Sequence, residues 1–253
     1  MRLKNERVLM TGGAGGLGSL IAEGLLKAGA NLTVVDRSST LPYQARLIQG
    51  DLASAEGIET VARTVESEPW DVLINLAGVQ HFGPFVAQSS AGIVTTYMVN
   101  LVAPARLAQA VVPGMKERRH GRIVNVGSIF GSINFAHFVT YSSSKSGLHG
   151  LSQALRRELT GSGVRVIYVA PRAVNTPLNS ALVHDFAKQT KMNMDEPDRV
   201  ARRILRAIKN CEREVFFGFP ESLFVRVNAL APSLVDGALA GNDQRAAKLF
   251  PTV

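Results

Sequence analysis

The chain has 253 residues, of which 46% are hydrophobic and 19% are charged. This length and balance suit one large α/β domain and exclude a disordered or fibrous chain. Its single cysteine, Cys211, excludes an internal disulfide and fits a reducing compartment, so we expect a cytoplasmic protein. We expect neither a signal peptide nor a membrane span, because no apolar run reaches roughly 18 residues.

The formal net charge is +8, and much of the excess lies in three basic clusters. They are Lys116, Arg118, Arg119 and Arg122; Arg156 and Arg157; and Arg199, Arg202, Arg203 and Arg206. Such clusters are usually solvated helix faces, although they can attract a nucleic acid, a lipid surface or an acyl carrier. No groove-binding motif accompanies the charge, so we expect a small-molecule substrate and no nucleic-acid partner.

The first segments alternate between strand and helix. Residues 7–11 and 31–36 read as strands, a glycine-rich turn occupies 12–18, and apolar residues recur at helical spacing through 17–28. Strand, glycine turn, helix and strand form the opening unit of a doubly wound nucleotide-binding fold.

The alternation continues to residue 218. Expected strands are 45–49, 71–76, 122–127, 164–169 and 214–218. Expected helices are 54–67, 90–118, 198–209 and one that carries Tyr141 and runs to about Leu159. The helix at 90–118 should be kinked or broken near Pro104 or Pro113. This pattern predicts a Rossmann-type parallel sheet of about seven strands with helices on both faces. Without a linker or composition shift, residues 1–253 should form a single dinucleotide-binding and catalytic domain.

The glycine turn is the first candidate site. It matches T-G-x-x-x-G-x-G through Gly12, Gly16 and Gly18, and G-x-G-x-x-G through Gly13, Gly15 and Gly18. Glycines permit a tight turn and close approach of a pyrophosphate, and the following helix offers backbone N–H groups to the phosphates. The turn therefore predicts a dinucleotide site.

Asp36 stands at the end of the second expected strand. A carboxylate there can hydrogen-bond the ribose hydroxyls of NAD and would repel the 2′-phosphate of NADP. The following Arg37 could instead accept that phosphate. We expect NAD, with NADP as the less favoured alternative.

Tyr141 and Lys145 are four residues apart, which places both on one face of a helix. A phenol with a pKa near ~10 is a poor base at neutral pH, and a nearby ammonium lowers that pKa. The pair could thus act as a general acid/base near neutrality. Ser128 follows the strand 122–127, at the edge where parallel sheets bind ligands.

These features together resemble the short-chain dehydrogenase/reductase family, from about residue 6 to residue 218. The motifs are TGGAGGLG at 11–18, Asp51, NLAG at 75–78, Asn100, Ser128, YSSSK at 141–145 and PRAVNT at 171–176. The resemblance implies an NAD(P)-dependent oxidoreductase acting on an alcohol or ketone. It also implies a homodimer or homotetramer.

The resemblance assigns roles to individual residues. Tyr141 would be the general acid/base, and Lys145 would lower its pKa and hold the nicotinamide ribose. Ser128 would polarise the substrate oxygen, and Asn100 would hold a water in a proton relay to Lys145. Expected cofactor contacts are Gly12, Gly16, Leu17, Gly18, Asp36, Arg37, Asp51, Leu52, Asn75, Ala77, Gly78, Tyr141, Lys145, Pro171, Val174 and Thr176. No metal site is expected, because the histidines lack ligand spacing.

One departure from the family pattern is Arg172, which follows Pro171 where the family usually has glycine. The simpler interpretation is a surface arginine in a tolerant loop. Alternatively, the loop tilts, or the guanidinium adds a charge near the pyrophosphate or the substrate.

The substrate side is predicted to be apolar, with about half of its large side chains only packing the loops. The candidates are Val79, His81, Phe82 and Phe85; Ile129, Phe130, Ile133, Phe135 and Phe138; and Leu178, Leu182, Phe186, Met192 and Met194. Residues 178–195 are expected to form a mobile substrate lid. The C-terminal extension 221–253 could cover the pocket, join subunits or rest on a membrane surface, and we favour the first two.

The leading hypothesis is an NAD(H)-dependent alcohol dehydrogenase or ketone reductase for an apolar substrate. One alternative is an NADP(H)-dependent ketone or 3-oxoacyl reductase. Another is a catalytically silent nucleotide-binding regulatory protein, against which the intact Asn100, Ser128, Tyr141 and Lys145 argue.

Overall fold

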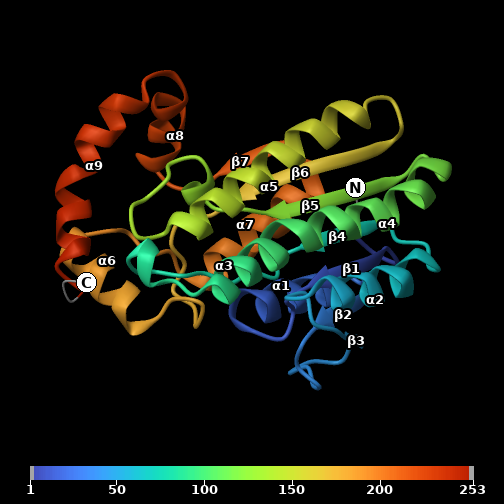
Figure 1. Ribbon diagram of the computed structural model, residues 1–253. Helices are drawn as coiled ribbons and strands as arrows, with labels where there is room; N and C mark the ends of the chain where they lie inside the picture. The colour runs from blue at the N-terminus through green and yellow to red at the C-terminus, as the bar shows by residue number, and fades with distance from the viewer. Residues whose placement is uncertain (1–2, 251–253) are drawn as a thin grey trace.

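The computed structural model describes residues 3–250, which contain a seven-stranded parallel sheet in the order β3-β2-β1-β4-β5-β6-β7 (Figure 1). Its strands are β1 (Arg7–Thr11), β2 (Asn31–Asp36), β3 (Arg46–Gln49), β4 (Val72–Asn75), β5 (Gly121–Val126), β6 (Val164–Ala170) and β7 (Glu214–Phe216). The strand order reverses between β1 and β4, and such reversals open a crevice at the carboxyl ends of the strands. The predicted Rossmann-type fold is confirmed.

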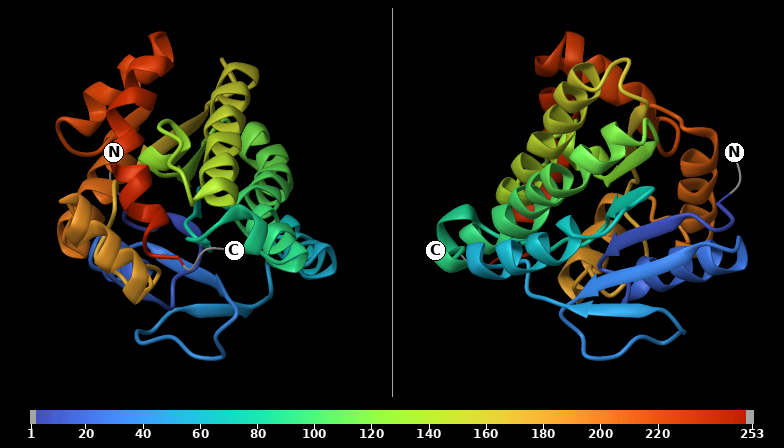
Figure 2. Two further views of the ribbon diagram at one scale, coloured as in Figure 1. Left: turned by 60° about the vertical axis from the view of Figure 1, so that its left-hand side comes forward. Right: turned by 90° about the vertical axis from the view of Figure 1, so that its right-hand side faces the viewer.

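Helices cover both faces of the sheet (Figures 1 and 2). One face carries α1 (Gly16–Lys27) and α7 (Pro197–Asn210), and the other carries α2 (Ala55–Glu66), α4 (Ala103–Glu117) and α5 (Val139–Glu158). Because both faces are covered, the central strands are largely apolar, and every residue of β4 and β5 is buried. The core therefore lies in two layers, above and below the sheet.

The segment expected to form one long helix is divided. It consists of α3 (Ser90–Tyr97), a π-helical turn η2 (Met98–Val102) and α4. The irregular turn immediately precedes Pro104, which lacks an N–H group and occupies the first turn of α4. The predicted break near Pro104 is confirmed, whereas α4 continues through Pro113.

The remaining short elements lie around the carboxyl edge of the sheet and beyond it. They are η1 (Phe85–Ala87), η3 (Ile129–Gly131), α6 (Ala181–Thr190), α8 (Glu221–Leu230) and α9 (Pro232–Ala247). In Figures 1 and 2, α8 and α9 form an arm at one side of the sheet, with α9 beside α6. Ala231 separates α8 from α9, and α9 contacts α6.

One residue of the basic clusters is buried, whereas most of the others are exposed as expected. Arg122 is only 1% exposed, forms an ion pair with Glu6 and approaches the carbonyl of Ile208, so the solvated reading is wrong for it. It lies on a central strand, where helices cover both faces. Within residues 3–250, no helix is long and apolar enough to cross a membrane.

Candidate active site

A cavity of about 610 Å³ runs along the carboxyl edge of the sheet, from the glycine turn to α5. It brings together most of the site residues predicted from the sequence. These are Gly12, Gly16, Leu17, Gly18, Asp36, Arg37, Asp51, Leu52, Ala77, Gly78, Ser128, Tyr141, Lys145, Pro171, Val174 and Thr176. Asn75 and Asn100 do not line this cavity.

The glycine turn packs closely against its neighbours. Gly12 has a φ of +73°, and a Cβ there would lie 2.7 Å from the Cα of Ala77. A Cβ on Gly18 would collide with the carbonyl oxygen of Gly12. Only glycine fits at either position, and the resulting cradle before α1 leaves backbone free to approach a pyrophosphate.

Asp36 is held at the end of β2 by two backbone groups. Its Oδ2 accepts a hydrogen bond from the N–H of Ala14 at 2.9 Å, and its Oδ1 accepts one from Ser38 at 3.1 Å. The neighbouring Arg37 is exposed. The fixed carboxylate therefore puts negative charge on the cavity wall beside the glycine turn.

Tyr141 and Lys145 lie one turn apart on α5 and are both buried. The Lys145 Nζ is 5.9 Å from the centre of the Tyr141 ring and donates a hydrogen bond to the carbonyl of Val126 at 3.0 Å. Burial lowers the pKa of Lys145 to about 8. Burial also raises the pKa of Tyr141 to about 12, and a hydrogen bond with Ser128 only partly opposes this rise.

The net pKa of Tyr141 is therefore raised in this structure, because loss of solvation disfavours the phenolate. The Tyr141 hydroxyl is consequently protonated at neutral pH and is poised to donate a proton. That Lys145 lowers this pKa stays a prediction for the working complex.

Ser128 follows β5 and is positioned by its surroundings. Its Oγ accepts a hydrogen bond from the N–H of Phe130 at 3.1 Å, and its carbonyl accepts one from the hydroxyl of Tyr168 at 3.4 Å. Tyr168 is fully buried, and a Cβ on Gly127 would collide with its hydroxyl. We did not predict Tyr168, because in the sequence it reads simply as an apolar strand residue.

Asn100 lies in the π-helical turn η2 and is fully buried. Its Oδ1 accepts from the N–H of Val79 at 2.9 Å, and its Nδ2 donates to the Val79 carbonyl at 2.8 Å and to Ser144 Oγ at 3.0 Å. The side chain thus ties the loop after β4 to α5. Both amide protons have protein acceptors, so the expected water relay is not built on the Asn100 side-chain NH₂ group.

Asn75 lies beneath the cavity rather than on its wall. It is 2% exposed, and its Nδ2 donates to Asn125 Oδ1 at 2.8 Å. Asn125 in turn donates to Ser152 on α5 at 2.8 Å. These contacts link Asn75 toward α5, so the structure does not bring its side chain to the cavity wall, and its predicted cofactor contact stays a prediction.

Arg172 is largely buried and paired, so the interpretation of it as a surface arginine is wrong. It also lines the active-site cavity. Its guanidinium donates to both carboxylate oxygens of Asp195 at 2.8 Å and to Glu221 at 3.1 and 3.2 Å. It is 15% exposed. Asp195 ends the expected lid and Glu221 begins α8, so Arg172 joins three segments. Neither partner was predicted, because both are distant in sequence.

The substrate end of the cavity is apolar, and only some of the predicted side chains line it. Val79, Phe130, Phe138, Leu178 and Met192 line the cavity. Phe82 and Phe135 do not line the cavity and pack against neighbouring rings instead. The ring centre of Phe82 is 4.5 Å from that of Phe138 and 5.1 Å from that of Phe250, and the ring centres of Phe135 and Phe130 are 4.3 Å apart. The expectation that part of the aromatic set only packs is thus consistent with the structure.

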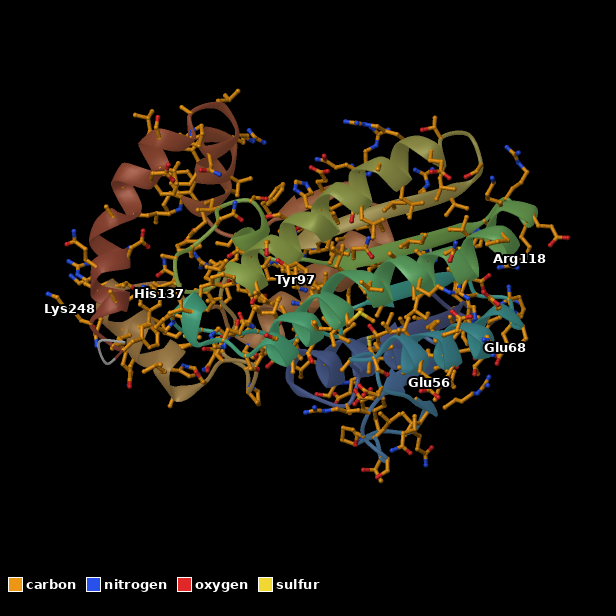
Figure 3. All side chains as sticks on the ribbon, viewed as in Figure 1. Glu56, Glu68, Tyr97, Arg118, His137 and Lys248 are labelled. Atoms are coloured by element: carbon orange, nitrogen blue, oxygen red, sulfur yellow. The ribbon has the colours of Figure 1, made fainter. Side chains whose placement is uncertain are left out.

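The end of α9 reaches this aromatic cluster. Figure 3 shows His137 beside the end of the arm, where Lys248 is labelled. The ring centres of His137 and Phe250 are 5.1 Å apart. The end of the C-terminal extension therefore packs against the predicted substrate loops. Among the side chains of residues 3–250, no cluster of three or more potential ligands could hold a metal ion.

Comparison with known proteins gives a consistent result. A family model described as short chain dehydrogenase matches residues 6–187. The ketoacyl reductase HetN of Nostoc sp. is 33% identical, over 92% of this chain and 88% of its own. A short-chain dehydrogenase from Streptomyces avermitilis superposes with a TM-score of 0.77 at 26% identity, covering 95% of this chain and 98% of that one. A short-chain dehydrogenase from Sphingobium yanoikuyae in complex with NADPH has a TM-score of 0.76 at 26% identity, covering 93% and 94%.

Proposed function

Because this chain belongs to the short-chain dehydrogenase family of oxidoreductases, we propose that it transfers a hydride between NAD(H) and the ketone or alcohol group of an apolar substrate. One observation carries the proposal. Ser128, Tyr141 and Lys145 meet at one end of a cavity whose other end is the glycine turn. A dinucleotide laid along that cavity would bring its nicotinamide to the three side chains.

The residues present fit such a cofactor. The cradle at Gly12 and Gly18, where a Cβ would collide with backbone, suits a pyrophosphate. Asp36 would hold the adenosine ribose, and Val174 and Thr176 would lie beside the nicotinamide. A bound nicotinamide supplies or accepts the hydride, and the protein supplies orientation and proton transfer.

Tyr141 is the proposed general acid and base. In the reducing direction its hydroxyl donates a proton to the carbonyl oxygen, and in the oxidising direction the phenolate removes a proton from the alcohol. Ser128 donates a hydrogen bond that orients the same oxygen. The protonated state that burial gives Tyr141 suits reduction at neutral pH. Tyr168 positions Ser128 through its hydrogen bond to the Ser128 carbonyl.

NAD is the proposed cofactor because the Asp36 carboxylate, fixed at the end of β2 beside the glycine turn, would repel the 2′-phosphate of NADP. The alternative is an NADP(H)-dependent ketone or 3-oxoacyl reductase. The exposed Arg37, the NADPH complex of one relative and the ketoacyl reductase name of another support it. An acyl chain would suit the apolar lining at Phe130, Phe138 and Met192.

Three further parts of the proposal concern architecture. Residues 178–195 would act as a lid, since Gln80 already reaches across the cavity mouth to donate to Asn179 at 2.9 Å. The C-terminal extension would close the substrate end through Phe250. The working form would be a homodimer or homotetramer of a single-domain chain.

The test is Tyr141→Phe, which removes the hydroxyl and keeps the ring. With a panel of apolar ketones and a 3-oxoacyl thioester, turnover should fall by about 10²–10⁴-fold while cofactor affinity stays unchanged. The matched control is Tyr97→Phe, whose hydroxyl bonds Ser143 on the outer side of α5 and should leave turnover intact. Undiminished turnover in Tyr141→Phe would refute the assignment. Cofactor binding without turnover in the native protein would favour the regulatory alternative.

A further inference from the structure

A second cavity, of about 400 Å³, lies next to the proposed active site. Its polar lining is dominated by five arginines: Arg172, Arg199, Arg202, Arg203 and Arg206. Asp195 is the one carboxylate among the lining residues in the part of the chain that the structure describes. Arg172 lines both this cavity and the active-site cavity, so the two share a wall.

The charges in this cavity are only partly compensated. Arg172 is paired with Asp195 and Glu221, and Arg203 forms a two-point pair with Glu212 at 2.6 and 2.9 Å. Arg202 lies 4.0 Å from the exposed Asp198, a distance at which little attraction survives in water. For Arg199 and Arg206, no ion pair forms with any residue between 3 and 250. The cavity therefore keeps surplus positive charge.

The helix α7 holds these arginines close together against their mutual repulsion. Its core-facing side is anchored by Ala201, Ile204 and Ile208, which are all buried. Like charges three or four residues apart on a helix destabilise it by about 0.2–0.5 kcal/mol per pair. A bound anion would relieve that repulsion, and the planar guanidinium group matches the oxygens of phosphates and carboxylates.

The shape of the cavity favours a small ligand over a macromolecule. Its walls come from three separate segments: the loop at Arg172, the helix α7 and residues 216–218, with Val200 and Phe217 providing apolar surface. Concave sites built in this way enclose small molecules. If a second copy of the chain docked on this face about a two-fold axis, the same basic residues would face one another, which is unfavourable.

We propose that this cavity binds a small polyvalent oxyanion, of the phosphate or the polycarboxylate class. The site is distinct from the phosphate cradle of the glycine turn. The cavity also adjoins the proposed lid, because its lining residue Arg172 is paired with Asp195 at the end of the lid. The proposal stands whether or not the chain reduces ketones.

The experiment is calorimetric titration with inorganic pyrophosphate and, separately, with citrate at constant ionic strength. Saturating NADH or NADPH, whichever binds, occupies the glycine turn and removes that competing site. The native protein should bind at least one of the two anions, and the preferred one assigns the class. The double variant Arg199→Ala/Arg206→Ala should bind it at least about tenfold more weakly, an energy of about 1.4 kcal/mol.

The control is Arg157→Ala/Arg213→Ala, which removes two equal charges from exposed positions outside the cavity. Its affinity for the anion should change less than about twofold. Equal weakening in the two double variants would assign the binding to diffuse surface charge and overturn the proposal. Absence of binding at millimolar anion would also overturn it. Tighter binding of a DNA duplex, lost in the Arg199→Ala/Arg206→Ala variant, would overturn the small-ligand assignment.

Discussion

Arg172 and Asp195 form a two-point ion pair in which Nε and Nη2 each lie 2.8 Å from a carboxylate oxygen. The side chains are 15% and 9% exposed. Asp195 also exchanges backbone hydrogen bonds with Ala173 and Asn175, at 2.8 and 3.0 Å. The end of the proposed lid is thereby fastened to the loop that follows β6, next to the proposed nicotinamide position.

Replacing Arg172 with Gln should loosen the lid. The Asp195 carboxylate would then be a buried charge without a counter-charge, which is unfavourable. Residues 178–195 should therefore move outward, because this movement exposes the carboxylate to water. We expect trypsin to cleave at Lys188 and Lys191 about tenfold faster than in the native protein, since local opening controls such cleavage. The variant should also show a higher KM for substrate.

Arg203→Gln is the matched control for this change. It removes a similar two-point pair, which joins the middle of α7 to Glu212 and includes no lid residue. Cleavage at Lys188 and Lys191 should then remain at the native rate. Equal acceleration in the two variants would mean that the lid responds to global stability and not to the Arg172–Asp195 pair.

The pKa of Tyr141 predicts opposite pH profiles for the two directions of the reaction. Burial raises this pKa to about 12, so the hydroxyl is protonated throughout the neutral range. Reduction uses the protonated form and should not increase with pH between neutrality and pH 9. Oxidation uses the phenolate, whose fraction grows about tenfold per pH unit below the pKa, so its rate should climb. Initial rates in both directions measure this. A plateau of oxidation already at neutral pH would show that the working complex lowers the pKa of Tyr141.

The fold was predictable because its signals are local. The alternation of apolar strands with amphipathic helices needs only neighbours in the sequence, and the glycine turn and the Tyr141–Lys145 spacing are local in the same sense. The break before Pro104 was also predictable, because proline acts on its own helix. Tyr141 and Lys145 lie on one face of α5, as expected for residues four apart on a helix.

The features that the sequence did not reveal concern contacts between distant segments. Arg172 was read as a surface residue because Asp195 and Glu221 are far along the chain. Asn75 does not line the cavity, and its partner Asn125 lies on the next strand and links it toward α5. The pKa of Tyr141 depends on burial by the whole fold, which no local spacing reveals. Such features require the tertiary structure.

Asp36→Ala should change the cofactor preference. The native carboxylate, fixed by Ala14 and Ser38, would repel a 2′-phosphate and accept hydrogen bonds from the ribose hydroxyls. Fluorescence titration should show weaker NADH binding and tighter NADPH binding in the variant, with the ratio of affinities shifted by at least about tenfold. Arg37 would then be free to contact the phosphate.

The control is Asp51→Ala, which removes an exposed carboxylate that lines the same cavity. It should change the affinities for NADH and NADPH to a similar degree, because the family resemblance implies that Asp51 faces the adenine and not the 2′ position of the ribose. A native preference for NADPH that Asp36→Ala leaves unchanged would contradict the assignment and would make Arg37 the determinant.

Lys145→Met should stabilise the protein at neutral pH while abolishing turnover. Burial lowers the pKa of Lys145 from 10.5 to about 8, which corresponds to about 3 kcal/mol of disfavoured charge burial. Methionine removes that cost but also removes the hydrogen bond to the Val126 carbonyl. The free energy of unfolding at pH 7 should therefore rise by about 1–2 kcal/mol.

The pH dependence of this difference separates charge burial from simple packing. Below about pH 8 the ammonium is charged in both the folded and the unfolded native protein, so the full cost is present. Between pH 8 and 10.5 the unfolded state binds more protons, so the native protein gains stability as the pH rises and the advantage of the variant disappears. Urea unfolding at pH 7 and pH 10 tests this, with the exposed Lys209→Met as a control that should show no such convergence. A stability difference that stays constant across this range would mean that methionine acts through packing and that the buried ammonium is not the source of the cost.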